Sequence, residues 1–298
     1  MPFEQVLRDN AGNSALLIGN GINRYNNDNG HNSWEGLLAG VAKSCATGMK
    51  TAPVGTSITE FYDVLDLKSK ADSSGLQAQF CELMSQWQPA EQHSRITGWA
   101  AQHRVPILTT NYDALLSRAS GSVFQRTTTE RFTDYYPWEC FYAPQPLAAP
   151  CDGFGIWHVN GMKKYHRSVR LGLSHYMGSV HRARNWMHGG NQRRLFNGRS
   201  KADWLGAHTW LHIFFSKPLI IFGLALAENE VFLRWLLIER AKYFRKFRAR
   251  EKPAWYIYSH DANDRTEEGK LFFLESIGVR CVKTTSYDQI YACAAWQD

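Results

Sequence analysis

Several polar side chains stand at the ends of apolar runs, and their types suit the binding or cleavage of a sugar-containing molecule. A histidine side chain ordinarily titrates near neutral pH, so His158 could move a proton beside a sugar ring, which suits glycosidic chemistry. Asn111 and Asp113 supply an amide and a carboxylate that can hydrogen-bond ribose hydroxyls and a carboxamide. The plainer interpretations stay open: His158 as a core histidine, and Asn111 and Asp113 as a helix cap.

Two glycine turns follow other apolar runs. Gly19, Asn20 and Gly21 come directly after residues 15–18, and Gly223 comes directly after residues 219–222. In a Rossmann unit such glycines allow a tight turn and let backbone N–H groups approach a pyrophosphate. Arg24 stands where the third glycine of Gly-x-Gly-x-x-Gly would fall, so a structural turn without a ligand remains an alternative.

Other chemistries lack their motifs. The chain has no Gly-x-x-x-x-Gly-Lys-Ser/Thr phosphate loop and no His-Glu-x-x-His helix. Its six cysteines form no Cys-x-x-Cys pair, and its histidines do not match a zinc spacing. We therefore expect no metal site and no disulfide framework.

The elements that must position these residues form an alternating pattern. Short apolar runs that are typical of buried strands occupy residues 15–18, 105–109, 155–159, 219–222, 254–258 and 278–282. Helical patterns occupy residues 90–103, 112–119, 229–248, 267–277 and 287–296, and another begins after Ser33 as N-cap. Alternating strands and helices predict a doubly wound, mostly parallel, Rossmann-like α/β sheet.

We expect one domain over residues 1–298 with a helical insertion at residues 36–104, where no convincing strand is found. Residues 120–152 are rich in Thr, Pro and aromatic side chains, which predicts a long loop with one strand near Val123 and Phe124.

The composition predicts a globular protein, and its basic segments leave contact with an acidic partner open as an alternative. The formal net charge is +7, and Lys and Arg concentrate in residues 182–201 and 240–252. Solvated helix faces explain such segments, and contact with nucleic acid or an acidic partner is the alternative. No apolar run approaches the roughly 20 residues of a membrane span. We expect a cytoplasmic protein without membrane contact.

The order of these motifs resembles the prokaryotic sirtuin-like family over roughly residues 14–283. It runs from Gly-Asn-Gly through Ser33-Trp34, Thr-Thr-Asn-Tyr-Asp and His-Val-Asn-Gly to Ile-Ile-Phe-Gly, and residues 109–115 are the most specific segment. The resemblance implies that NAD is bound. Its implied catalytic residues are Asn111 and His158, and its implied cofactor-binding residues are Gly19, Asn20, Gly21, Asn23, Thr110, Asp113, Gly223 and Asn229.

The resemblance also implies roles. The first glycine turn would cradle the diphosphate, Asn111 would contact the nicotinamide ribose and help hold a water molecule, and Asp113 would face the nicotinamide amide. His158 would be the catalytic histidine, and Gly223 would lie beside the ribose and adenine half.

Departures from the deacylating sirtuins refine the expected function. Those enzymes carry a zinc module of two Cys-x-x-Cys pairs, which this chain lacks. The pattern is similar instead to sirtuin-like effectors of antiviral defence, which destroy NAD. We therefore expect an NAD glycohydrolase that cleaves the nicotinamide–ribose bond. The alternatives are an NAD-dependent protein deacylase and a non-catalytic module that senses nucleotides or binds nucleic acid. Expected partners are further copies of the chain, as a homo-oligomer, and, by analogy with paired defence systems, a hexameric translocase ATPase.

Overall fold

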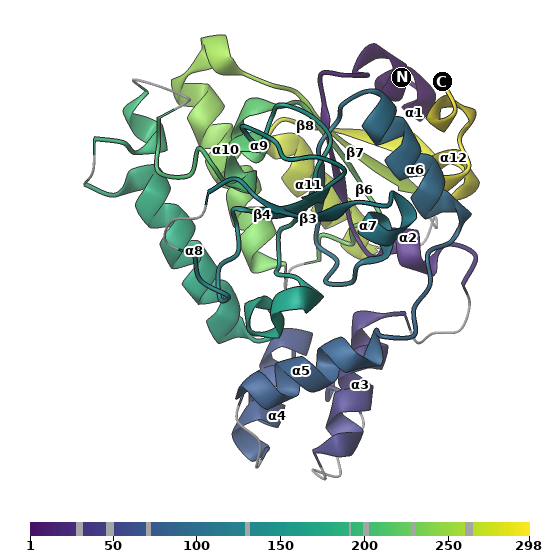
Figure 1. Ribbon diagram of the computed structural model, residues 1–298, viewed down its shortest axis with the longest axis vertical. Coiled ribbons are helices and arrows are strands. Elements are labelled where there is room, and N and C mark those ends of the chain that lie inside the picture. The colour runs from purple at the N-terminus through teal and green to yellow at the C-terminus, as the bar shows by residue number, and fades with distance from the viewer. Residues whose placement is uncertain are drawn as a thin grey trace.

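One mixed sheet organises the protein (Figure 1). The computed structural model describes residues 1–27, 32–45, 51–69, 73–128, 132–190, 192–198, 203–227, 230–259 and 265–298. The eight strands of the sheet lie in the order β3-β4-β5-β2-β1-β6-β7-β8. They are β1 (Ala15–Ile18), β2 (Ile107–Thr109), β3 (Val123–Arg126), β4 (Cys140–Ala143), β5 (Ile156–His158), β6 (Leu219–Phe222), β7 (Ala254–Ser259) and β8 (Val279–Thr284).

Six neighbouring strands of the sheet, in the order β5-β2-β1-β6-β7-β8, all pair in parallel. Numbered along the chain, these six strands have the order 3-2-1-4-5-6 of a Rossmann fold. The expected α/β fold with a mostly parallel sheet is confirmed. Each of the six apolar runs predicted as a strand contains one, although β2 begins only after Pro106, which has no N–H to donate to the ladder.

Successive residues of each strand face opposite sides of the sheet. Leu17 and Leu108 belong to one apolar core, whereas their neighbours Leu16 and Ile107 belong to the other. Because both faces are covered, the central strands are apolar throughout rather than alternating. The first core is covered by α8 (Leu173–His188), α9 (Trp210–Ser216), α10 (Val231–Lys246) and α11 (Arg265–Ser276). The second is covered by α1 (Phe3–Asp9), α6 (Glu91–Gln102), α7 (Leu115–Ala119) and α12 (Asp288–Tyr291).

The stretch 120–152 forms a β-hairpin rather than a long loop with one strand. Strand β3 lies where the sequence predicts it, and β4, which was not predicted, pairs with it in antiparallel register. Strand β4 also pairs with β5, so the hairpin extends the sheet at one edge. The aromatic pair Phe141 and Tyr142 is a weak local signal for β4, since aromatic residues favour strands.

Three helices form a separate group at one end of the molecule: α3 (Trp34–Ser44), α4 (Ile58–Lys68) and α5 (Ser73–Leu83) (Figure 1). They share a third apolar core with Val169 and Leu171. Ser33 caps α3 as expected, because its hydroxyl accepts the amide of Gly36 at 3.0 Å. Helix α6, also within residues 36–104, packs on the sheet instead. The described residues between 36 and 104 contain helices and no strand.

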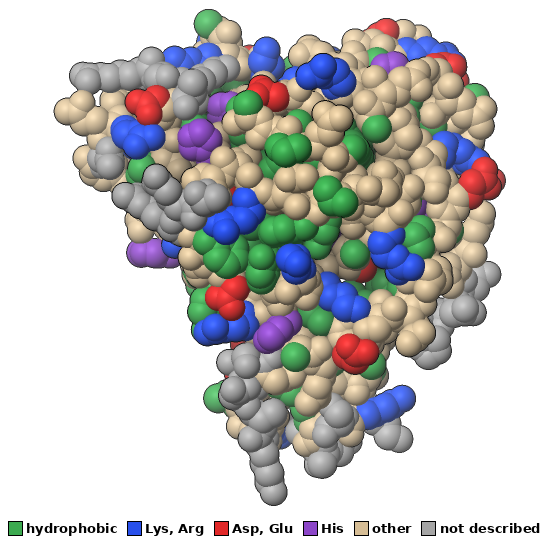
Figure 2. All heavy atoms as spheres, in the orientation of Figure 1, with side chains coloured by type: hydrophobic (Ala, Val, Ile, Leu, Met, Phe, Trp, Pro, Cys, Tyr) green, Lys and Arg blue, Asp and Glu red, His purple; other side chains and the backbone are tan. Residues whose placement is uncertain are grey.

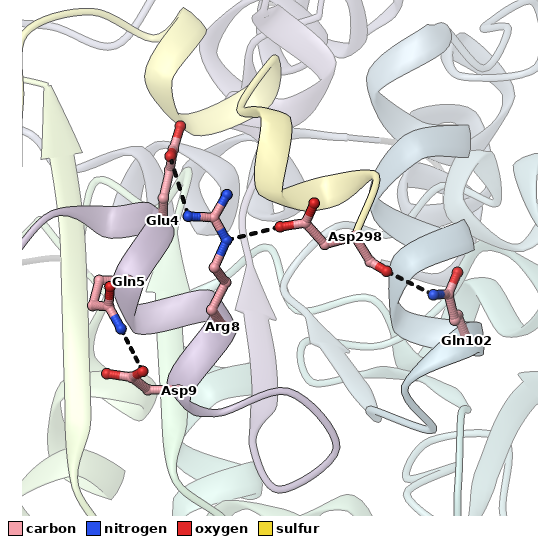
Figure 3. A network of polar contacts seen from close by, with 6 residues as sticks. All are labelled: Glu4, Gln5, Arg8, Asp9, Gln102 and Asp298. Carbon is pink, nitrogen blue, oxygen red and sulfur yellow. Dashed lines mark hydrogen bonds and ion pairs between the residues drawn. The ribbon is translucent and has the colours of Figure 1, made fainter.

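The two ends of the chain meet beside α6 (Figure 3). Arg8 in α1 donates to the Asp298 carboxylate at 2.8 Å, and Gln102 of α6 donates to the Asp298 backbone oxygen at 2.7 Å. Arg8 and Gln102 precede β1 and β2 in the chain, so this exposed cluster lies on the side of the sheet where these strands begin. It joins first and last elements and stands apart from the candidate site.

The basic segments are only partly free surface. Arg240 is buried and donates to the backbone carbonyls of Phe214, Lys217, Lys252 and Pro253, so it ties α10 to the starts of β6 and β7. Arg245, Arg248 and Lys252 line a groove near the amino ends of β7 and β8. No helix in the described part of the chain is both long and apolar enough to cross a membrane.

Candidate active site

The carboxyl ends of β1, β2 and β6 meet where the strand order changes direction, between β1 and β6. Doubly wound folds bind their ligands at this position. Two adjoining cavities open there, with about 1150 Å³ and about 470 Å³ of empty space when open solvent is included. Asn20, Trp34, Thr110 and Glu230 line both cavities, so these four residues mark the junction.

Three glycines let the turn after β1 pack against the turn after β6. The Gly21 amide donates to the Gly223 carbonyl at 2.8 Å, and the Gly19 amide donates to the last residue of β6 at 3.1 Å. A Cβ atom on Gly19 would lie 2.4 Å from the Gly223 carbonyl oxygen. Because both N–H groups are engaged, the glycines join the two turns closely, and Asn20 is the residue of the first turn that lines both cavities.

A buried chain of side chains fixes the Asp113 carboxylate. The amide of Ala90 donates to Nδ1 of His93 at 3.1 Å, so the ring proton lies on Nε2. Nε2 donates to Oδ1 of Asn23 at 2.9 Å. This contact turns the Asn23 amide nitrogen toward Asp113 at 2.8 Å and Asn20 at 2.9 Å. Asp113 is thereby held in the wall of the smaller cavity.

Asn111 lines the smaller cavity, and His158 lies behind it. Nδ1 of His158 donates to the Asn111 carbonyl at 2.7 Å, since a carbonyl can only accept. Burial lowers the pKa of His158, so the ring is neutral and Nε2 keeps a free lone pair. This Nε2 and Oδ1 of Asn111 are buried without a hydrogen-bond partner among the described residues. His158 is not among the residues that line either cavity.

The smaller cavity has aromatic walls and oxygen atoms directed to it. Trp34, Phe80 and Trp87 come from the helical group and the segment that follows it, whereas Asp113 and Asn160 come from the ends of strands. The side-chain oxygen of Asn160 is buried and has no partner in the described structure. Aromatic faces and carboxylate oxygens both attract a flat cationic group.

The larger cavity combines backbone turns with aromatic and charged side chains. Four tyrosines line it, namely Tyr256, Tyr258, Tyr287 and Tyr291. Lys270 pairs with Glu267 at 3.1 Å in the same wall and lies over the Tyr256 ring. Arg24 is exposed beside the first glycine turn. Aromatic rings suit a flat base, and an exposed cation beside a backbone turn suits a phosphate.

Glu230 stands at the junction of the two cavities, immediately before α10. Its Oε2 is buried without a hydrogen-bond partner among the described residues, and its side chain does not cap the helix. Burial raises the pKa of this carboxyl from 4.5 to about 7. A carboxyl group with a pKa near neutrality in a cleft is a candidate for proton transfer.

The structure brings most of the expected site residues together. The two cavities are lined by Asn20, Gly21, Thr110, Asn111, Asp113 and Gly223. Gly19, Asn23 and His158 line neither cavity, but each is hydrogen-bonded to Asn111 or Asp113, which line the smaller one. Asn229, the remaining expected residue, lies outside the described residues.

The sequence patterns do not select several residues of the site, among them His93, Asn160, Tyr176 and Glu230. Glu230 stands at a helix start, where an acidic residue is ordinary, and Asn160 stands only two positions after His158. Helix α8, which carries Tyr176, is absent from the prediction because its apolar residues are interspersed with histidine and arginine. The weak signal for it is the spacing of Tyr176, Ala183 and Met187 on one face.

Neither a known family model nor a curated protein matches this chain. No group of three or more His, Cys, Asp or Glu side chains that could hold a metal ion lies within the described ranges. The geometry and chemistry of the two cavities are therefore the basis on which a function is assigned.

Proposed function

We propose that this chain is an NAD glycohydrolase of sirtuin-like type, which binds NAD across the two cavities and hydrolyses the bond between nicotinamide and ribose. The observation that carries the proposal is the junction formed by Asn20, Trp34, Thr110 and Glu230. A smaller cavity suited to a flat cation and a larger one suited to a nucleotide meet at this point. The reacting bond of NAD lies between groups of these two kinds.

The smaller cavity would hold the nicotinamide ring, which is positively charged in NAD. The faces of Trp34, Phe80 and Trp87 favour such a ring. The Asp113 carboxylate would accept a hydrogen bond from the nicotinamide amide. As the glycosidic bond breaks, the positive charge moves from the ring to the ribose, and the unpartnered oxygen of Asn111 would stabilise it there.

The larger cavity would hold the ADP-ribose half. Its tyrosines supply flat faces for adenine, and Arg24 supplies a cation for the diphosphate. Because Gly19, Gly21 and Gly223 carry no side chain, the two turns pack closely and a ligand can approach their backbone.

His158 would act on the reaction through Asn111 or with its free Nε2. Its hydrogen bond fixes the Asn111 backbone, and its neutral ring can orient a ribose hydroxyl or accept a proton from it. Asn111 would fix the ribose and the attacking water in a reactive geometry. Both residues would therefore be required for turnover.

The test is nicotinamide release from NAD by the purified protein and by the Asn111→Ala and His158→Ala variants. We expect release by the wild type and its loss by at least about a hundredfold in each variant. His181→Ala removes an exposed histidine of α8 and serves as the control with wild-type activity. Undiminished NAD loss in both site variants would contradict the assignment.

Depletion of NAD by this reaction would suit a defence effector that is toxic to an infected cell. An enzyme of this kind must be controlled, so we propose that its activity depends on self-assembly or on a partner, with a hexameric translocase ATPase as one candidate. The protein deacylase alternative would require an open channel for an acyl-lysine peptide, and activity on such peptides would distinguish it.

A further inference from the structure

We propose that the Glu230 carboxylate is the base that takes the proton from the water molecule attacking the ribose. This inference rests on the proposed hydrolysis of NAD and assigns its proton acceptor. Glu230 lines both cavities, so it stands where the bond between their occupants would lie.

The carboxyl group of Glu230 is free to act in this way. Oε2 has no hydrogen-bond partner in the described part of the chain, although it is buried. Glu230 precedes α10, but its side chain makes no capping hydrogen bond. A buried polar atom without a partner costs stability, so a role with a ligand or water accounts for its retention.

The other acid–base groups of the site are less well placed. Asp113 also lines the smaller cavity, but its two oxygens accept hydrogen bonds from Asn23 and from the amide of Leu115. His158 lines neither cavity. Glu230 is therefore the carboxyl group at the junction that has an oxygen without a hydrogen-bond partner among the described residues.

The surroundings of Glu230 set the pH at which it can accept a proton. The titratable and charged groups that share its two cavities are Arg24, Glu35, Tyr112, Asp113, Tyr176, Tyr256, Tyr258, Glu267, Lys270, Tyr287 and Tyr291. Tyr112 and Tyr176 share the smaller cavity with Glu230, and burial raises the pKa of both phenols, so they stay neutral near pH 7. Desolvation then favours the neutral form of Glu230 and places its pKa at about 7.

The step balances without a further reactant. The water oxygen forms a bond with the anomeric carbon of the ribose as the bond from that carbon to the pyridinium nitrogen breaks. The electron pair of the broken bond goes to the nitrogen, so nicotinamide leaves as a neutral molecule. The water proton goes to the Glu230 carboxylate, which later loses it to solvent, and the product is ADP-ribose.

The experiment measures kcat/KM for nicotinamide release between pH 5 and 9. Wild-type activity should rise as pH increases to about 7 and then level, because the ionised carboxylate is required. Glu230→Gln should lower activity at pH 8 by at least about a hundredfold and remove the dependence on this ionisation. Glu82→Gln, an exposed carboxyl on α5, is the matched control. NAD binding by Glu230→Gln, measured by titration calorimetry, shows that the variant is folded.

A second variant separates base catalysis from a structural role. Glu230→Ala should recover nicotinamide release when sodium azide is added, with ADP-ribosyl azide as product, because azide attacks without losing a proton. Wild-type rates and the same pH profile in Glu230→Gln would overturn the inference and leave the proposed function intact. A wild-type protein that binds NAD but releases no nicotinamide under any condition would contradict both.

Discussion

At the scale of single residues, Asn23 connects two side chains that are far apart in the sequence. It accepts from His93 and donates to Asp113, and each contact depends on the proton position set by the Ala90 amide. His93 lines neither of the two cavities and is connected to Asp113 through Asn23, so we regard it as a positioning residue. Replacing His93 should mainly affect binding of the nicotinamide ring, because Asp113 lines the smaller cavity.

Replacing His93 tests this chain. His93→Leu removes the donor to Asn23 and leaves a buried amide oxygen without a partner, which should lower the free energy of unfolding by about 1–3 kcal/mol. Asp113 then loses its fixed orientation, and we expect KM for NAD to rise by about tenfold with a smaller change in kcat. Steady-state kinetics and thermal unfolding give both quantities.

The matched variant is His93→Gln, whose side-chain amide can still donate to Asn23. It should recover most of the lost affinity, which a purely structural loss would not predict. An unchanged KM in His93→Leu would show that Asp113 does not depend on His93.

The sequence shows which residue types stand at the strand ends, but it does not show which side chains they contact. Asn111, Asp113 and His158 could be selected because acid–base and amide groups follow apolar runs. His93 lies on α6 and Glu230 immediately before α10, positions at which an acidic or polar residue usually faces solvent. Their roles depend on burial by segments about 70 or more residues away, which no local pattern encodes.

At the scale of elements, the turns after β1 and β6 act as one unit. Gly223 has φ of +69°, and a Cβ atom there would lie 2.7 Å from the Tyr291 hydroxyl. Gly21 lies against the same hydroxyl, so three elements, β1, β6 and α12, meet at this point.

Gly223→Ala should therefore both strain the backbone and displace Tyr291. We expect a loss of about 1–3 kcal/mol in the free energy of unfolding, together with weaker NAD binding. Gly98→Ala in α6 is the control, because a Cβ atom there meets nothing within 4 Å. Chemical denaturation and calorimetry measure the two effects, and a Gly223→Ala protein that matches wild type in both would contradict this account of the turns.

The parallel strands were predictable because burial on both faces makes them continuous apolar runs. Strand β4 and helix α8 were not, for different reasons. Strand β4 is short and bounded by prolines at 137 and 144, and α8 is rich in histidine and arginine with small residues on its buried face. Such elements are stabilised by tertiary contacts more than by their own pattern.

At the scale of the whole molecule, charge and apolar surface suggest contacts with other chains. Figure 2 shows hydrophobic side chains gathered over the β3–β4 hairpin with Lys and Arg around them. Val123 and Phe132 are exposed in this region, and Arg126 lies over the Phe132 ring. The groove with Arg245 and Lys252 offers a second basic surface that suits an acidic partner or nucleic acid.

We predict that the protein forms a homo-oligomer or assembles with a partner before it is active. Light scattering coupled to size exclusion, with and without candidate partners, measures the assembled mass, and NAD loss is followed in the same fractions. Assemblies should carry more activity per chain than the monomer. A monomer that is inert in every mixture would contradict this prediction.

The most direct test of the central claim is the product balance of purified protein incubated with NAD. Chromatography should show NAD consumed with one nicotinamide released for each ADP-ribose unit formed, and Asn111→Ala should show neither product. Binding of NAD without consumption, in the isolated chain and in every assembly, would instead mean that the two cavities hold a nucleotide without cleaving it.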